Sequence, residues 1–190
     1  MDTVSIMIVG VGGQGTLLAS RVIGDVLLAR GYDVKLSEVH GMSQRGGSVV
    51  TYVRYGEKVY SPVVEDGEAD IILAFEPLEA ARWLPRLKKG GVILTNIHPV
   101  LPMPVITNQA AYPSDLIAKL SGRANVIALD ALALAERAGT PKAVNTVLLG
   151  RLSRLLPDIP AELWRSALSA HLKPQHLSSN LQAFLAGSAC

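Results

Sequence analysis

The chain has 190 residues, of which 49% are hydrophobic and 18% are charged, with a formal net charge of +2. This length suits a single domain with a sizeable core. The mild charge and the aromatic content of 5% argue against nucleic-acid binding. No apolar stretch approaches the roughly 18 residues of a membrane span. A hydrophobic content of 49% is high for a soluble protein of this size, so part of the apolar surface is expected to face a partner.

Cysteine and histidine are too sparse for a metal centre in this chain. The one cysteine is Cys190, and the four histidines are scattered at positions 40, 98, 171 and 176. Such a set excludes a disulfide framework, a zinc knuckle or an iron-sulfur cluster, and no metal is expected. The start Met1-Asp2-Thr3 lacks the basic residues of a signal peptide, so a cytoplasmic location is expected.

A glycine-rich turn follows the first apolar run. Residues 4–16 read V-S-I-M-I-V-G-V-G-G-Q-G-T, and Gly10, Gly12 and Gly15 fit the pattern G-x-G-x-x-G. The pattern predicts a strand, a tight turn and a helix whose free N–H groups face an anion. An alternative is that the glycines only permit the sharp turn from strand to helix and that nothing is bound there.

The next two segments predict a β-α-β unit with a parallel crossover. Apolar residues recur at helical spacing from Gly13 to Arg30, and Tyr32 to Val39 alternates polar and apolar side chains. Glu38 lies at about the spacing at which dinucleotide-binding proteins place the acid that binds the ribose. An NAD-binding Rossmann oxidoreductase is therefore an alternative function. The other explanation is that Glu38 is an ordinary glutamate in solvent at the end of a strand.

The loop after the second strand carries polar groups typical of a site. Residues 40–47 read H-G-M-S-Q-R-G-G, in which Ser43 and Gln44 can hydrogen-bond and Arg45 can hold a carboxylate or phosphate bidentately. At the carboxyl end of a sheet strand, this loop is expected to meet the glycine turn on one anion. The alternative is a surface loop whose arginine pairs with a local acid.

An antiparallel hairpin is expected next. Ser48 to Tyr55 and Lys58 to Val63 are β-rich and are joined by Gly56-Glu57, a pair typical of a two-residue hairpin turn. This hairpin is expected at the sheet edge.

The remaining chain predicts alternating strands and helices and then a helical end. Strands are expected at 69–75, 91–96 and 124–129, and an extended passage at Pro99 to Pro104. Helices are expected at 77–87, 113–120, 131–138, 160–172 and 174–186, and a further helix is expected to begin at Thr140-Pro141. Trp164 and Phe184 are expected in the core. Asn145 lies within an apolar helix, so it is expected to cap a loop or touch a ligand.

Four strings together carry a family resemblance. They are G-V-G-G-Q-G-T at 10–16, E-V-H-G-M-S-Q-R-G-G at 38–47, N-x-x-x-L-G at 145–150 and N-L-Q-A-F-L-A-G at 180–187. In this order they resemble the gamma domain of 2-oxoacid:ferredoxin oxidoreductases, and more closely the stand-alone small (beta) subunits of indolepyruvate ferredoxin oxidoreductases. The resemblance covers nearly the whole chain. It implies an α/β, Rossmann-like domain over 1–190, with an α/β core at 1–140 and a helical segment at 141–190.

The resemblance also implies a subunit rather than a complete enzyme. The family decarboxylates 2-oxoacids oxidatively with coenzyme A, giving acyl-CoA, CO2 and reduced ferredoxin, and the closer likeness implies an aryl 2-oxoacid. It uses thiamine diphosphate with Mg²⁺ and 4Fe-4S clusters, whereas this chain has neither cluster cysteines nor the G-D-G string of thiamine enzymes. Both cofactors are therefore expected on a large partner subunit in a heterotetramer, and the isolated chain is expected to be inactive.

The expected contribution of this chain is a set of binding residues near coenzyme A. Arg45 is the principal cation toward a coenzyme A phosphate or substrate carboxylate, and Gln14 and Gln44 are hydrogen bonders. The expected cofactor-binding residues are Gly12, Gly13, Gln14, Gly15, Thr16, Ser43, Gln44, Arg45, Gly46 and Gly47. No catalytic residue is expected. A P-loop hydrolase is set aside because Gly15, rather than lysine, precedes Thr16, while a purely structural domain with an empty turn stays an alternative.

Overall fold

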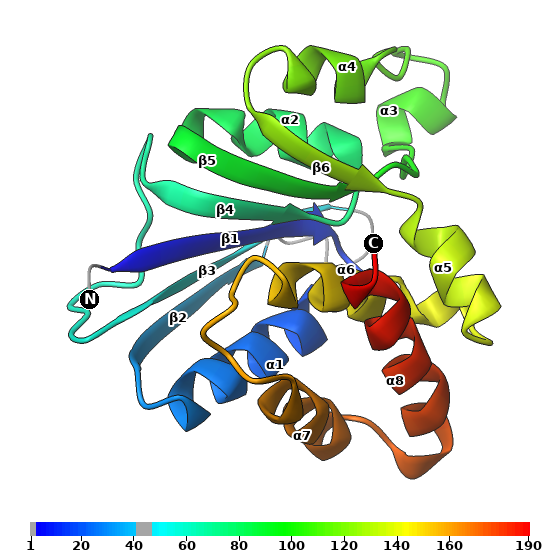
Figure 1. Ribbon diagram of the computed structural model, residues 1–190. Coiled ribbons are helices and arrows are strands. Elements are labelled where there is room, and N and C mark those ends of the chain that lie inside the picture. Colours follow the sequence, from blue (N-terminus) through cyan, green and yellow to red (C-terminus); the bar gives the residue numbers. More distant parts are fainter. Residues whose placement is uncertain (1–2, 41–46) are drawn as a thin grey trace.

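The computed structural model describes residues 3–40 and 47–190, except for the side chain of His40. A six-stranded sheet runs through the molecule in the order β2-β3-β1-β4-β5-β6 (Figure 1). The strands are β1 (Val4–Val11), β2 (Asp33–His40), β3 (Ser48–Gly56), β4 (Ala69–Ala74), β5 (Leu87–Asn96) and β6 (Asn125–Leu129). The pairs from β1 through β4 and β5 to β6 are parallel, whereas β3 is antiparallel to both β1 and β2. The expected α/β class with a mostly parallel sheet is confirmed.

Helices cover both faces of the sheet. On one face lie α1 (Thr16–Ala29), α6 (Val144–Ser153), α7 (Ala161–His171) and α8 (Pro174–Ser188), and on the other lie α2 (Pro77–Trp83) and α4 (Leu116–Ser121) (Figure 1). The remaining elements are α3 (Met103–Ile106), α5 (Ala131–Arg137) and the 3-10 turns η1 (Leu84–Arg86) and η2 (Pro141–Ala143). None of the helices among the described residues is both long and apolar enough to cross a membrane.

The side-chain alternation of β1 supplies both halves of the core. Ile6 and Ile8 pack with the α1, α6, α7 and α8 helices, while Met7 and Val9 pack with α2 on the opposite face. This is the two-residue period of a strand buried on both faces. Trp164 and Phe184 are 0% and 2% exposed, which confirms their place in the core.

The expected hairpin is wrong. Among the described residues, 58–63 form no strand, and β3 is an inner strand rather than an edge strand. Both edges of β3 already pair with β1 and β2, so no edge is left for a following strand. The backbone N–H of Val59 instead donates to Asp33 Oδ2 at 2.9 Å. The observed β-α-β unit also differs from the predicted one, because β3 lies between β1 and β2 in the sheet.

Two of the predicted element boundaries differ from the observed ones, in segments that contain glycine or proline. The first helix begins at Thr16 rather than Gly13, because Gly13 and Gly15 have φ angles of +101° and +83°, outside the helical region. The passage from Pro99 to Pro104, expected to be extended, contains the start of the one-turn helix α3.

Two glycines allow α6 and α8 to pack backbone against backbone. A Cβ at Gly150 would lie 2.0 Å from the carbonyl oxygen of Phe184, and a Cβ at Gly187 would lie 1.9 Å from that of Val147. Neither position has room for any side chain. The glycines of the third and fourth sequence strings thus serve a helix contact.

Candidate functional site

The glycine turn lies at the carboxyl end of β1 and leads directly into α1. A Cβ at Gly10 would meet Gln14 Oε1 at 2.9 Å and Phe75 Cβ at 3.1 Å, so the strand end is too crowded for a side chain. The N–H of Gly12 donates to the carbonyl oxygen of Gly47 at 3.0 Å. This bond brings the end of the 40–47 loop against the glycine turn.

Gln14 fastens the turn to the sheet. Its side-chain Oε1 accepts from the N–H of Val11 at 2.7 Å, and its Nε2 donates to the carbonyl oxygen of Phe75 at 3.3 Å. These bonds connect the carboxyl ends of β1 and β4. Thr16, the first residue of α1, is 5% exposed. The turn is thus held by the bonds of Gln14 to the strand ends and by the buried start of the helix.

Asn145 supports the turn from the opposite side. Its Nδ2 donates to the carbonyl oxygen of Gly15 at 3.4 Å, and its Oδ1 accepts from the N–H of Thr146 at 2.8 Å. The Thr146 hydroxyl donates to Asn180 Oδ1 at 2.7 Å. Asn145 is thus satisfied within the protein, and it couples the turn to the α6–α8 pair.

A cavity of about 430 Å³ opens beside the turn. Main-chain and amide groups form its polar part, the side chains of His98 and Lys142 can carry positive charge, and Val100, Leu132 and Val144 form an apolar wall. Its lining residues are Gly13, Gln14, Gly15, Asn96, His98, Val100, Leu132, Pro141, Lys142, Val144 and Asn145. Such a combination suits a ligand with an anionic group and an apolar portion.

Asp130 orients the histidine of this cavity. His98 Nε2 lies 2.8 Å from Asp130 Oδ1, and the same oxygen accepts from the N–H of Ala133 at 2.8 Å as the N-cap of α5. That backbone bond, and then His98, hold the pKa of Asp130 below its ordinary value. The neighbouring Asn96 caps the same helix, because its Oδ1 accepts from the N–H of Ala131 at 3.1 Å.

Sequence reasoning missed His98, Asn96 and Lys142 as cavity residues. Asn96 ends β5 and His98 follows it, and Lys142 follows the stop at Gly139. For Asn96 and His98 the available signal was their position at the end of a parallel strand, because those strand ends share one edge of the sheet, whereas Lys142 follows no strand.

The second sequence-predicted loop is only partly described. Ser43, Gln44, Arg45 and Gly46 lie outside the described residues, and Gly47 is half-buried against the glycine turn. The two segments meet at the Gly12–Gly47 bond, while their convergence on one anion and the ligand roles of the side chains stay predictions.

Glu38 does not occupy the position that dinucleotide binding requires. Its Oε1 accepts from the Ser20 hydroxyl of α1 at 2.7 Å, and β2 is separated from β1 by β3. In the dinucleotide-binding order the second strand adjoins the first, which brings its acid close to the glycine turn. The arrangement does not support the NAD interpretation.

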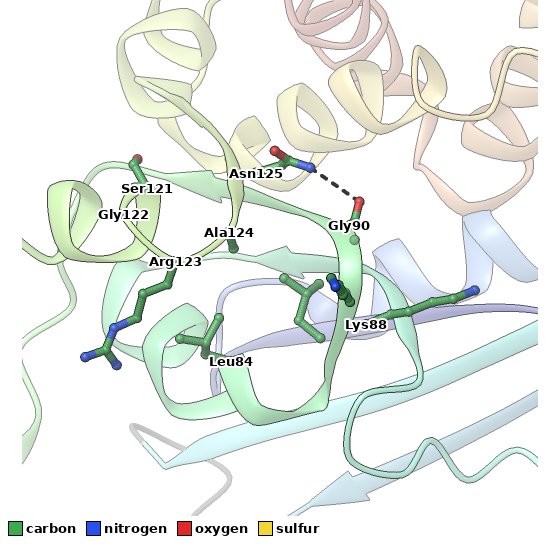
Figure 2. A pocket seen from close by; sticks show the side chains of 11 residues that line it. Leu84, Lys88, Gly90, Ser121, Gly122, Arg123, Ala124 and Asn125 are labelled. Carbon is green, nitrogen blue, oxygen red and sulfur yellow. Dashed lines mark hydrogen bonds between the residues drawn. The ribbon is translucent and has the colours of Figure 1, made fainter.

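A second cavity of about 440 Å³ lies at the other end of the sheet, where β5 and β6 begin (Figure 2). Lys88 Nζ pairs with Asp70 Oδ1 at 2.9 Å, and Asn125 Nδ2 donates to the carbonyl oxygen of Gly90 at 3.3 Å. In Figure 2 the side chains of Lys88 and Arg123 extend to opposite sides. None of the lining residues of this cavity belongs to the predicted site residues, whereas Gly13, Gln14 and Gly15 line the cavity beside the glycine turn, which is therefore the candidate site.

One protein family matches nearly the whole chain. The family model described as pyruvate ferredoxin/flavodoxin oxidoreductase matches residues 5–190. The chain therefore belongs to this family.

Relatives agree with that assignment, and a solved structure shares the fold. The chain is 42% identical to the indolepyruvate oxidoreductase subunit IorB of Thermococcus kodakarensis, over 98% of this chain and 95% of the relative. It is equally identical to IorB of Pyrococcus horikoshii, over 97% and 94%. The fold is similar, with a TM-score of 0.77 and 20% identity, to 2-oxoglutarate:ferredoxin oxidoreductase from Magnetococcus marinus, covering 100% of this chain and 31% of that one.

Proposed function

We propose that the chain is the small subunit of an indolepyruvate:ferredoxin oxidoreductase. The assembled enzyme would decarboxylate an aryl 2-oxoacid oxidatively with coenzyme A, giving acyl-CoA and CO2 and reducing ferredoxin. The observation that carries the proposal is the 42% identity to IorB subunits over nearly the full length of both chains. The cytoplasmic location expected from the sequence stays a prediction.

Thiamine diphosphate, Mg²⁺ and the 4Fe-4S clusters are assigned to a large partner subunit. The composition supports this division, because a cubane cluster takes four cysteine thiolates and the chain has one cysteine. Within residues 3–40 and 47–190, no three His, Cys, Asp or Glu side chains are grouped as a metal site would need. If the partner subunit holds the cofactors, the role of this chain is to supply further residues to the substrate-binding site.

The contribution of this chain is a binding surface made of the glycine turn, the 43–47 loop and the cavity beside them. The turn of Gly12, Gly13, Gln14, Gly15 and Thr16 presents the amino end of α1, where backbone N–H groups favour an anion. Ser43, Gln44 and Arg45 would add side-chain donors, with Gly46 and Gly47 allowing close approach. Lys142 and His98 would complete the set of donors.

The ligand assigned to this surface is coenzyme A or the oxoacid carboxylate. Both carry anionic groups beside apolar parts, which matches the donors and the wall of Val100, Leu132 and Val144. The solved enzyme from Magnetococcus marinus, which contains a domain of this fold, has coenzyme A and succinyl-CoA bound.

The proposal is tested first by recovering the partner. The tagged chain is purified anaerobically from its native host, and the captured proteins are identified by mass spectrometry and assayed for iron, thiamine diphosphate and indolepyruvate-dependent ferredoxin reduction. A large iron-sulfur and thiamine subunit in a complex of two large and two small chains is the expected result. A chain that returns alone, with no such activity, would contradict the proposal.

Arg45→Ala then tests the site within the assembled enzyme. We expect KM for coenzyme A or for the oxoacid to rise about tenfold or more, because a hydrogen bond to a charged group contributes about 1.5–3 kcal/mol. Arg165→Ala, at an exposed position on α7, is the matched control. Unchanged kinetics for both substrates in Arg45→Ala would remove Arg45 from the site.

A further inference from the structure

The segment between β5 and α4 has an unusual surface composition. From Ile97 to Ser114 the chain contains no Asp, Glu, Lys or Arg, although charged residues make up 18% of the whole. We call residues 97–114 the neutral arm. Its one histidine, His98, is bonded to Asp130. Surface segments of soluble proteins are normally charged, and the cores of protein interfaces are depleted of charge.

The neutral arm also exposes large apolar side chains. They are between 36% and 64% exposed, and they are Ile97, Val100, Leu101, Met103 and Ile106. A group of apolar side chains this close in sequence differs from the single exposed apolar residues that any surface carries. In Figure 1 the arm and its helix α3 lie away from α7 and α8.

The neutral arm has a defined structure. The carbonyl oxygen of Pro104 accepts from the N–H groups of Gln109 and Ala110, at 2.8 and 3.0 Å. The Tyr112 hydroxyl donates to Glu76 Oε2 at 2.9 Å, and Glu76 is 1% exposed at the N-cap of α2. The arm is thus tied to the start of α2 by a buried carboxylate, while its large apolar side chains are exposed.

The neutral arm adjoins the candidate site. Asn96, His98 and Val100 line the cavity beside the glycine turn, and the exposed residues from Leu101 to Ile106 continue from them along the chain. A partner that closes this cavity from the side of β5 would therefore cover the arm as well.

We propose that the neutral arm is the docking surface for the large subunit, an inference that rests on the proposed function. The cofactors assigned to the partner must reach the cavity at which this chain would bind coenzyme A or oxoacid, and the arm forms one rim of that cavity. In the Magnetococcus marinus structure a domain of this fold makes up 31% of a longer chain. The fold thus occurs beside further protein within one enzyme, and an uncharged apolar face on the large subunit is the complementary surface.

The edge strand β2 is a weaker candidate for the same partner. Leu36 and Val39 are exposed there, at 39% and 50%. The same strand carries the charged residues Asp33, Lys35 and Glu38, whereas the neutral arm carries none.

The test is co-purification of the large subunit with variants of the tagged small chain. Met103→Glu/Ile106→Glu adds two carboxylates to the arm at side chains that are 64% and 58% exposed. Leu28→Glu/Leu185→Glu adds the same charges on α1 and α8, where exposure is 58% and 56%. Circular dichroism and thermal melting of each isolated chain establish that the variants are folded.

We expect the arm variant to recover less than a tenth of the large subunit that wild type recovers, while the control variant retains it. Retention by the arm variant would overturn the inference and leave the proposed function standing. Equal loss in both variants would also overturn it. A wild-type chain that is a dimer, and that the arm variant converts to a monomer, would assign the face to a second copy. Failure of the wild-type chain to bring any large subunit would instead contradict the proposed function.

Discussion

The side chain of Asn145 occupies the space in which a side chain at Gly15 would stand. A Cβ at Gly15 would lie 2.4 Å from Asn145 Nδ2, and the same nitrogen donates to the Gly15 carbonyl oxygen at 3.4 Å. The last glycine of the turn is thus required both by its φ of +83° and by a neighbour 130 residues away. The turn and the C-terminal helices form one unit through this contact.

Gly15→Ala is expected to destabilise the protein more than Gly13→Ala. Both positions have positive φ, and a left-handed residue other than glycine costs roughly 1–2 kcal/mol. No described atom lies within 4 Å of a Cβ at Gly13, whereas the Cβ at Gly15 meets Asn145. We expect a difference of at least about 1 kcal/mol in the free energy of unfolding, measured by urea titration.

The source of that difference can be isolated with Asn145→Ala. Adding Gly15→Ala to an Asn145→Ala background should cost less than adding it to wild type, because the clashing amide is gone. Additive costs would contradict the assignment of the clash to Asn145.

Gly150→Ala is expected to separate α6 from α8. Its Cβ would lie 2.0 Å from the Phe184 carbonyl oxygen, which is backbone and cannot rotate away. Overpacking of a core costs about 1–3 kcal/mol, and we expect a loss at or above the upper end of that range. Gly122→Ala is the control, because its nearest described contact would be an ordinary 3.6 Å. Thermal melting compares the two variants, and equal Tm values would refute the close helix contact.

Asp130→Asn tests the charge that orients His98. Asparagine is as good an N-cap as aspartate, so the variant removes the charge while keeping an acceptor for the Ala133 N–H. Because Asp130 and His98 are each 42% exposed, we expect a loss of under about 1 kcal/mol near pH 7.

The pH dependence of that loss has a definite sign. The folded state lowers the pKa of Asp130, so its stabilising contribution is complete above the unfolded value of 3.8 and is lost as the pH falls through the folded pKa. The difference in unfolding free energy between wild type and Asp130→Asn should therefore shrink below pH 3.8. A difference that grows as the pH falls below 3.8 would contradict the lowered pKa.

Tyr112→Phe is expected to loosen the neutral arm. The variant removes the hydrogen bond that the hydroxyl donates to the buried Glu76, at a cost of about 1–3 kcal/mol in unfolding free energy. Burial, together with Glu76, raises the pKa of Tyr112, so the hydroxyl keeps its proton and the bond at neutral pH. Tyr60→Phe, at a side chain that is 88% exposed, should change stability little. Faster amide hydrogen exchange in residues 97–114 of Tyr112→Phe alone is the expected readout.

Local patterns were sufficient to predict most elements of this protein. The apolar run at 4–9, the helical spacing from Gly13 to Arg30 and the stop at Gly139 act within a few residues, so the sequence alone predicts the mostly parallel α/β class and the core places of Trp164 and Phe184. The glycine pattern likewise predicted the turn at the carboxyl end of β1.

Only the tertiary structure decided which strands and side chains meet. The insertion of β3 between β2 and β1 depends on pairing between strands distant in sequence, and it removed both the expected hairpin and the ribose position of Glu38. The His98–Asp130 pair and the Asn145–Gly15 contact join residues that no local pattern connects. Propensity and periodicity act along the chain, whereas these contacts arise from packing across it, which is why they required the folded structure.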